Sequence, residues 1–110
     1  MATHQKIIRT WSGWTTLENA SAYEKFLVEE VFLDVKKKGV DGLEKVSIST
    51  LTHNEEVQFF LVLQFSTLEA VKKFAGENYK MAYIPEKAKQ LLKRYDHTAK
   101  HFELKQELLL

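Results

Sequence analysis

Two side chains in strand-like segments could handle charge on a small molecule. Arg9 lies in a segment rich in Ile, Thr and Trp, and its guanidinium could hold an anionic or enolate oxygen of a ligand. An ion pair at a dimer interface is an equally open use for it. His101 lies near the chain's end, and its imidazole could act as a base with a near-neutral pKa, or as a hydrogen-bonded wall residue. We take Arg9 and His101 as the candidate catalytic residues.

The histidines do not form a metal-binding pattern. His97 and His101 are four residues apart, a spacing that brings two ligands together on a helix. On a strand, such residues share a face but lie about 13 Å apart, which is too far for one ion. The chain has no cysteine, so disulfides, zinc–thiolate sites and thiol nucleophiles are excluded. Serine, histidine and acidic residues show no spacing typical of a hydrolytic triad. We expect no bound metal and no cofactor.

Aromatic residues follow the first predicted strand, the end of the third, and the second predicted helix. An aromatic pocket with a few polar groups is the usual form of a small-molecule site, and packing in the core is the alternative for each residue. Two of the tyrosines lie in an irregular segment, which favours a pocket mouth. The candidate ligand-binding residues are Trp11, Phe65, Phe74, Tyr79 and Tyr83.

Composition narrows the class of protein further. The chain has 110 residues, 45% of them hydrophobic and 28% charged, which is typical of one globular domain spanning 1–110. A net charge of +1 argues against nucleic-acid binding. The polar N-terminus and the lack of any long apolar stretch argue against a membrane partner. We therefore expect a cytoplasmic protein.

The first half of the chain alternates strand and helix signals. Residues 6–14 predict a strand, with Arg9 and Trp11 on one face. Thr15 and Glu18 form a capping-box pattern that predicts a helix start. The stripe that follows is Tyr23, Phe26, Leu27, Val31 and Val35, and Gly39 ends the helix. Val28, Phe32 and Leu33 fall off the stripe, so the helix either touches a second neighbour or frays near Leu33.

The second half repeats this order. Strands are predicted at 43–52 and 57–65, joined by the polar turn 53–56. A helix capped by Ser66 or Thr67 follows and ends at Gly76. Pro85 begins a third, short helix in which Ala88, Leu91, Leu92 and Tyr95 recur at steps of three and four. The last strand is predicted at 97–104, and residues 105–110 form an apolar-ended tail.

This order predicts an α+β fold of the ferredoxin-like βαββαβ type, with a four-stranded antiparallel sheet and a core at about 6–104. The helices of such a fold cover one face of the sheet. In the third strand Phe60 and Val62 are apolar on the opposite face, which predicts that this face is also covered. A second copy of the chain is the simplest cover, so we expect a homodimer.

Several segments together resemble the antibiotic biosynthesis monooxygenase-like (ABM) domains of the dimeric α/β-barrel superfamily. They are the first strand IIRTWSGW, the helix segment AYEKFL, the strand–helix junction FFLVLQFSTLEAVKKFAGENY, the segment YIPE and the final HFEL. The junction is the most specific of them. The resemblance covers about nine-tenths of the chain.

The resemblance implies a dimeric α/β barrel and a cofactor-independent monooxygenase acting on a small hydrophobic aromatic compound. Because family members share a fold more than an activity, a non-catalytic homodimer that binds a small ligand, or a stress-related protein, is the alternative. Haem-degrading relatives use an Asn on the first strand, a Trp near the end of the second helix and a His further on. This chain has Phe74 and Ile84 at the last two positions and no Asn on the first strand.

Overall fold

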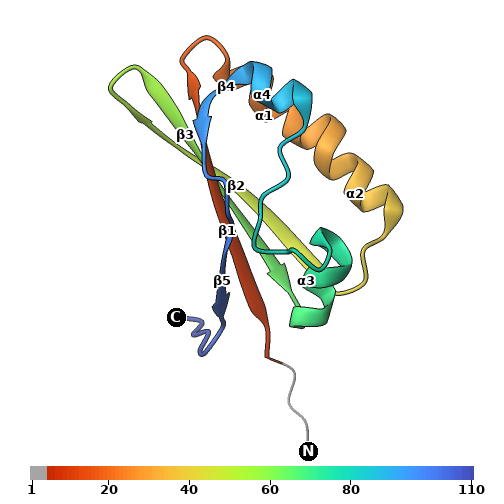
Figure 1. Cartoon of the computed structure of the whole chain (residues 1–110). Helices are drawn as coiled ribbons and strands as arrows, with labels where there is room; N and C mark the ends of the chain where they lie inside the picture. The colour runs from red at the N-terminus through yellow and green to blue at the C-terminus, as the bar shows by residue number, and fades with distance from the viewer. Residues whose placement is uncertain (1–4) are drawn as a thin grey trace, which may run out of the picture.

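The computed structural model describes residues 5–110, which form one antiparallel sheet with the helices on one side (Figure 1). The elements, in chain order, are β1 (Ile7–Thr16), α1 (Ala20–Phe26), the π-helical turn η1 (Leu27–Val31), α2 (Phe32–Lys38), β2 (Leu43–His53), β3 (Glu56–Phe65), α3 (Leu68–Ala75), α4 (Glu86–Leu91), β4 (Leu92–Tyr95) and β5 (Lys100–Glu103). The strand order is β2-β3-β1-β4, and β5 also pairs with β1. Strands β4 and β5 pair with successive parts of β1, so together they make an interrupted fourth strand. The predicted ferredoxin-like α+β class is confirmed.

The core lies between the helices and one face of β1 and β3. On β3, Val57, Phe59, Leu61, Leu63 and Phe65 are all buried. Residues opposite each other in an antiparallel pair point to the same side, and Arg9 lies opposite Leu63 while Trp11 lies opposite Leu61. Both candidate residues on β1 therefore face the helices.

The hairpin between β2 and β3 is as predicted. Asn54 and Glu55 both have positive φ, at 49° and 63°, and they form the two-residue connection between the paired residues His53 and Glu56. Two positive φ angles in a two-residue loop are typical of the tight turns whose twist suits a hairpin.

The predicted capping box at Thr15 is wrong. Thr15 is fully buried within β1, and the first helix begins only at Ala20, after Asn19. The hydroxyl of Thr16 instead accepts a hydrogen bond from the backbone N–H of Asn19, at 3.1 Å. Pairing of Thr15 with Val57 on one side and Leu92 on the other keeps it in the sheet, which outweighs the local capping signal.

The π-helical turn η1 explains the residues that fell off the predicted helical stripe. A π turn inserts an extra residue per turn and rotates the apolar face that follows it. Leu27, the first residue of this turn, is buried, and its last residue, Val31, packs against the core together with Phe32, which follows the turn. Val28 and Leu33 remain 53% and 42% exposed, and the helix continues to Lys38 rather than fraying.

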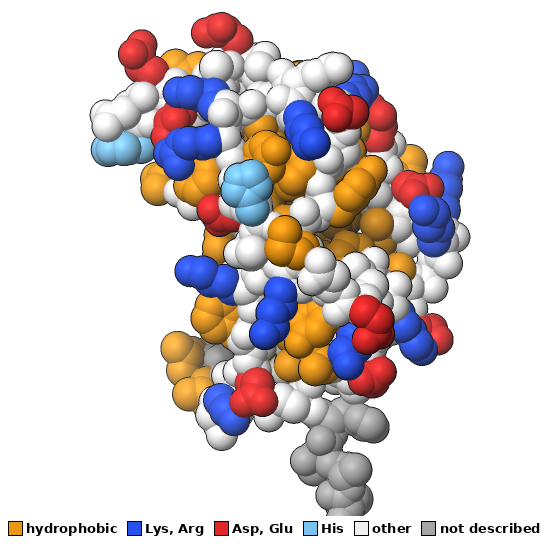
Figure 2. Space-filling view, in the orientation of Figure 1, with side chains coloured by type: hydrophobic (Ala, Val, Ile, Leu, Met, Phe, Trp, Pro, Cys, Tyr) orange, Lys and Arg blue, Asp and Glu red, His pale blue; other side chains and the backbone are white. Residues whose placement is uncertain are grey.

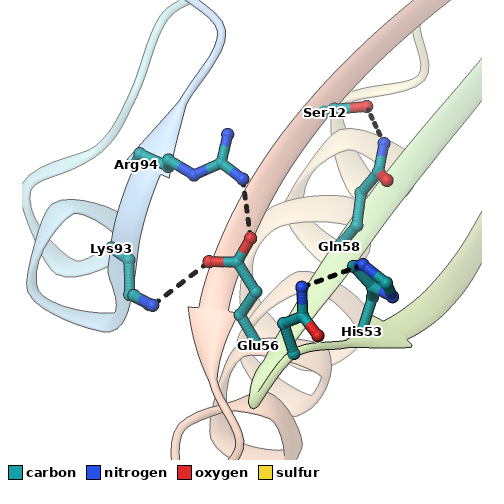
Figure 3. A network of polar contacts seen from close by, with 7 residues as sticks. Ser12, His53, Glu56, Gln58, Lys93 and Arg94 are labelled. Atoms are coloured by element: carbon teal, nitrogen blue, oxygen red, sulfur yellow. Dashed lines mark hydrogen bonds and ion pairs between the residues drawn. The ribbon is translucent and has the colours of Figure 1, made fainter.

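The predicted third helix is too long. It ends at Leu91, and Leu92–Tyr95 is strand β4, paired with β1 from Gly13 to Thr15. Figure 3 shows Glu56, at the start of β3, accepting from Lys93 and Arg94 of β4, with distances of 3.1 Å and 2.6 Å. The Arg94 guanidinium also lies 4.0 Å from the centre of the Trp14 ring. These contacts and the sheet pairing outweigh the helical spacing of Leu91, Leu92 and Tyr95.

None of the helices formed by residues 5–110 covers the second face of the sheet, and several side chains on this face are apolar. Phe60, Leu51 and Phe102 are 40%, 62% and 51% exposed, and the register places all three on this face. Beyond β5, Leu108, Leu109 and Leu110 are also exposed. None of the helices in residues 5–110 is long and apolar enough to span a membrane.

Candidate ligand-binding site

A cavity of about 120 Å³ lies between the helix-facing side of the sheet and the helices. Its walls come from β1, β3, the helical stretch α1-η1-α2, and the segment that joins α3 to α4. The lining residues are Arg9, Trp11, Tyr23, Phe26, Leu27, Val31, Phe32, Leu61, Leu63, Phe74, Ala82, Tyr83, Ile84, Pro85 and Ala88. Figure 2 shows hydrophobic side chains gathered in the middle of this view, with charged side chains around them. The cavity is therefore apolar, with few polar groups.

Arg9 is the one lining residue with a permanent charge, and it is 93% buried, since its relative exposure is 7%. One terminal nitrogen, Nη1, donates to the backbone oxygen of Tyr79 at 2.6 Å and lies 3.0 Å from Nε2 of His101. Its guanidinium carbon also lies 5.7 Å from the centre of the Phe74 ring. No ion pair found among residues 5–110 includes Arg9. Burial without a counter-charge lowers the pKa of Arg9.

His101 lies behind Arg9 rather than in the cavity wall. It is the β5 residue directly opposite Arg9, and its ring meets that of Tyr79 edge-on, with centres 5.0 Å apart. Because a guanidinium only donates, Nε2 accepts from Arg9 and the proton of the neutral ring belongs on Nδ1. Burial, then the charges of Arg9 and Lys80, lower the pKa of His101 to about 4. A pKa of about 4 makes His101 a weak base at neutral pH, and its contact with Nη1 makes it an acceptor that orients Arg9.

Tyr23 is a site residue that sequence reasoning assigned only to the core. It is 98% buried, with an exposure of 2%, and its ring packs edge-on against Phe59 at 4.9 Å. Its hydroxyl has no hydrogen-bond partner within residues 5–110. It is also not one of the solvent-inaccessible polar atoms that lack a partner in this part of the chain. The hydroxyl therefore reaches open space, and Tyr23 lines the cavity. A tyrosine in a stripe otherwise built from Phe, Leu and Val was the available signal, because a buried hydroxyl needs a partner.

Of the five candidate ligand-binding residues, Trp11, Phe74 and Tyr83 line the cavity. Tyr83 is 86% exposed, which places it at the mouth. Phe65 does not line the cavity, because it is completely buried against Phe74 at 5.5 Å between ring centres. Tyr79 does not line it either, since its ring packs on His101 while its backbone oxygen binds Arg9.

Trp11 is held in one orientation. Its indole nitrogen donates to the backbone oxygen of Asp96 at 2.7 Å, in the break between β4 and β5. Gly13 leaves room for the ring, because a Cβ at this position would lie 2.5 Å from the edge of the indole. The absent side chain of Gly13 thus lets Trp11 lie flat along β1, with its ring at the cavity wall.

The segment between α3 and α4 forms the outer wall and is tied to the interrupted strand. The backbone N–H of Ala82 donates to the backbone oxygen of His97 at 2.9 Å. The backbone N–H of Ala99 donates to the backbone oxygen of Lys80 at 2.8 Å. In Figure 1 this segment runs from α3 to α4, between the sheet and the helical stretch α1-η1-α2. The break between β4 and β5 therefore supplies backbone partners for the cavity wall, which a continuous β strand would not offer in this place.

The described residues contain no group of three or more His, Asp or Glu side chains arranged to hold a metal ion. Arg9 is a permanent donor, and the other polar groups that we find at the cavity are tyrosine hydroxyls. This arrangement can bind and orient an electron-rich oxygen on an otherwise apolar molecule.

Comparisons with known proteins support the fold. No protein-family model matches the chain, and no curated protein matches it. Among solved structures, the chain is similar to a crystal structure from Bacillus cereus whose protein is named as a candidate antibiotic biosynthesis monooxygenase. The TM-score is 0.61 at 11% sequence identity, and the match covers 96% of this chain and 99% of that chain. At this identity the likeness concerns the fold.

Proposed function

We propose that this chain is a cofactor-independent monooxygenase-like protein that acts on a small hydrophobic aromatic compound. The observation that carries the proposal is Arg9, a buried guanidinium in the wall of an aromatic cavity that has no counter-charge in the described part of the chain. The name of the similar Bacillus cereus structure agrees with it. A phenol or enol bound here would lose its proton more readily, because its oxyanion would face a positive charge in an apolar environment.

Such an anion is electron-rich and can itself reduce O₂. In the proposed reaction the ring carbon para to a phenolate oxygen becomes a carbonyl carbon, so that the phenol is converted to a quinone. One oxygen atom of O₂ enters the substrate at this carbon, and the other leaves as water with the hydrogen of that carbon and the proton of the phenol. The substrate supplies all four electrons. Arg9 would stabilise the developing oxyanion, while Trp11 and Phe74 would hold the ring in place.

A non-catalytic homodimer that binds a small apolar ligand is the second candidate, and a specific observation favours it. The lowered pKa of His101 leaves it a weak base, and it does not line the cavity. Burial also raises the pKa of Tyr23, so that its hydroxyl keeps its proton. The enzyme hypothesis therefore needs a substrate acidic enough to ionise against Arg9 alone.

Oxygen uptake and absorbance with quinol-like and polyphenolic compounds distinguish the two candidates. The enzyme hypothesis expects turnover that falls at least a hundredfold in Arg9→Ala and less in Tyr23→Phe and His101→Ala. Arg94→Gln is the control, because its guanidinium lies on Trp14 outside the cavity. Binding of these compounds without oxygen consumption would favour the ligand-binding protein instead.

We also propose that the chain is a homodimer that buries the helix-free face of the sheet. The exposed Phe60, Leu51 and Phe102 on this face support the proposal. The cavity lies on the other face, so each subunit would keep its own site.

A further inference from the structure

We infer that the Arg9 cavity selects a single-ring aromatic anion, a benzoate- or phenolate-like molecule, over neutral compounds and over fused ring systems. This inference rests on the proposed site and makes its ligand class specific. Two independent observations carry it: the unused donors of Arg9, and the size of the cavity.

The first observation is the number of N–H donors of Arg9 that have no acceptor within residues 5–110. A guanidinium has five N–H donors, two of them on each terminal nitrogen. Both partners of Arg9 bind Nη1, and within residues 5–110 neither Nε nor Nη2 has an acceptor. Neither atom is sealed, because the oxygen of Thr15 is the only fully buried, unpartnered side-chain atom in this part of the chain. The three N–H donors on Nε and Nη2 are therefore open, on a residue that lines the cavity, and two of them form one edge of the guanidinium.

The charge balance points to an anion. Moving a guanidinium out of water is costly unless an opposite charge compensates for it. No carboxylate pairs with Arg9 in the described residues, and the nearest imidazole, His101, is neutral at physiological pH. Lys80 lies close enough to act on His101 and adds a second positive charge to the region. A ligand carrying one negative charge would supply what the protein lacks, and a planar carboxylate matches the open edge of a guanidinium.

The size of the cavity limits the rest of the ligand. Its volume is about 120 Å³, and an apolar cavity of roughly 150 Å³ is known to admit benzene. This volume is close to that of a cavity for one aromatic ring, and Trp11, Leu61, Leu63 and Phe74 are among the residues that would surround the ring. A fused three-ring system is larger than this volume, so part of it would lie outside the apolar walls, past Tyr83 at the mouth.

Isothermal titration calorimetry tests both parts, with benzoate, benzamide and 9-anthracenecarboxylate as probes. We expect benzoate to bind at least tenfold more tightly than benzamide, which has the same shape without the charge. We expect 9-anthracenecarboxylate, which has the charge on three fused rings, to bind at least tenfold more weakly than benzoate. Equal binding of benzoate and benzamide would overturn the anion preference. Equal binding of the two carboxylates would overturn the size limit.

Variants assign the effect to Arg9. Arg9→Gln should reduce benzoate binding at least tenfold and change benzamide binding less than twofold, while Arg94→Gln should leave both unchanged. Unchanged benzoate binding in folded Arg9→Gln would overturn the inference. If that variant does not fold, the comparison of benzoate with benzamide on the unaltered protein still decides.

The ligand preference and the proposed enzyme activity can fail independently of each other. Benzoate binding without any oxygen consumption would retain this inference and refute the enzyme. Oxygen consumption with neutral, fused-ring quinols and no benzoate binding would do the reverse.

Discussion

The Arg9–His101 pair shows how one strand register decides the chemistry of two side chains. Their positions on β1 and β5 are directly opposite, so the guanidinium reaches Nε2 of the imidazole at 3.0 Å. The buried environment and the two nearby cations then keep His101 neutral. The sequence identified both residues as functional candidates, but it could not show that one would suppress the basicity of the other.

The first prediction concerns this titration. NMR titration of the His101 ring should give a pKa of about 4, below the ordinary value of 6.5. In Arg9→Gln the pKa should rise, though not to 6.5, because burial is the largest cause of the shift. A lowered pKa means that the unfolded chain takes up a proton before the folded chain does. Stability should therefore be fully present above about pH 6.5 and decrease between about pH 6.5 and 4. A His101 pKa near 6.5 in the intact protein would contradict this.

Thr15 provides the second prediction. Its side chain is fully buried, and its hydroxyl has no hydrogen-bond partner among residues 5–110. Thr15→Val removes the unpaired hydroxyl and keeps the shape, so the free energy of unfolding should rise by about 1–3 kcal/mol. Urea unfolding at neutral pH measures it. Thr15→Ser, which keeps the hydroxyl and loses a methyl group, should instead lower the stability. A loss of stability in Thr15→Val would mean that the hydroxyl has a partner after all.

At the scale of elements, local sequence signals predicted those helices and turns whose tertiary contacts favour the same conformation. The hairpin turn at Asn54 and Glu55, and the helix that begins after Thr67, were predicted correctly. The hydroxyl of Thr67 accepts from the N–H of Ala70 as an N-cap should. Leu92–Tyr95 has helical spacing, but it lies where β1 has a free edge. The pairing of β4 with β1 joins residues about 80 positions apart, so a local sequence pattern cannot predict it. A local pattern also cannot predict the position of the segment between α3 and α4, which depends on this pairing.

The third prediction tests what holds β4 in place. Glu56 accepts from both Arg94 and Lys93, and these hydrogen bonds lower its pKa below the ordinary value. Glu56→Gln should therefore destabilise the protein at pH 7 and increase hydrogen exchange in β4. Stability from a lowered carboxyl pKa is present above the ordinary value of 4.5 and is lost as the pH falls through the folded value. The difference between variant and wild type should thus shrink as the pH falls below 4.5.

Glu103→Gln is the matched control for that experiment. Glu103 also pairs with a lysine, Lys105 at 3.2 Å, but both side chains are mostly exposed. Exposed pairs contribute little, so this variant should unfold with nearly unchanged stability. Equal effects of the two substitutions at pH 7 would show that Glu56 does not anchor β4.

At the scale of the whole molecule, the alternation of strands and helices was sufficient to predict the ferredoxin-like fold. Apolar residues on both faces of β3 predicted further that the sheet should be covered twice. In the single chain, the helix-free face leaves Phe60 40% exposed. The sequence pattern therefore predicts that both faces of β3 are buried, whereas a single chain buries only the face toward the helices. It could not predict the cavity itself, whose polar groups depend on which atoms of Arg9 and Tyr23 find partners.

The last prediction is that two copies pair through this face. Stable interfaces bury roughly 1,200–2,000 Å² in total, and two sheet faces carrying Phe60, Leu51 and Phe102 are suited to an interface of that size. Light scattering at low micromolar concentration should then give twice the chain mass of 12.8 kDa. Phe60→Glu places a charge in the interface and should produce the monomer.

Leu33→Glu is the control for this experiment, because Leu33 is equally exposed, at 42%, but lies on α2 on the opposite side of the sheet. This variant should remain dimeric. Because a dimer that folds as a unit gains stability from mass action, the melting temperature of the wild type should rise with concentration, and that of Phe60→Glu should not. A wild-type monomer whose melting temperature is constant over a hundredfold dilution would refute the dimer, and the second apolar face of β3 would then need a different partner.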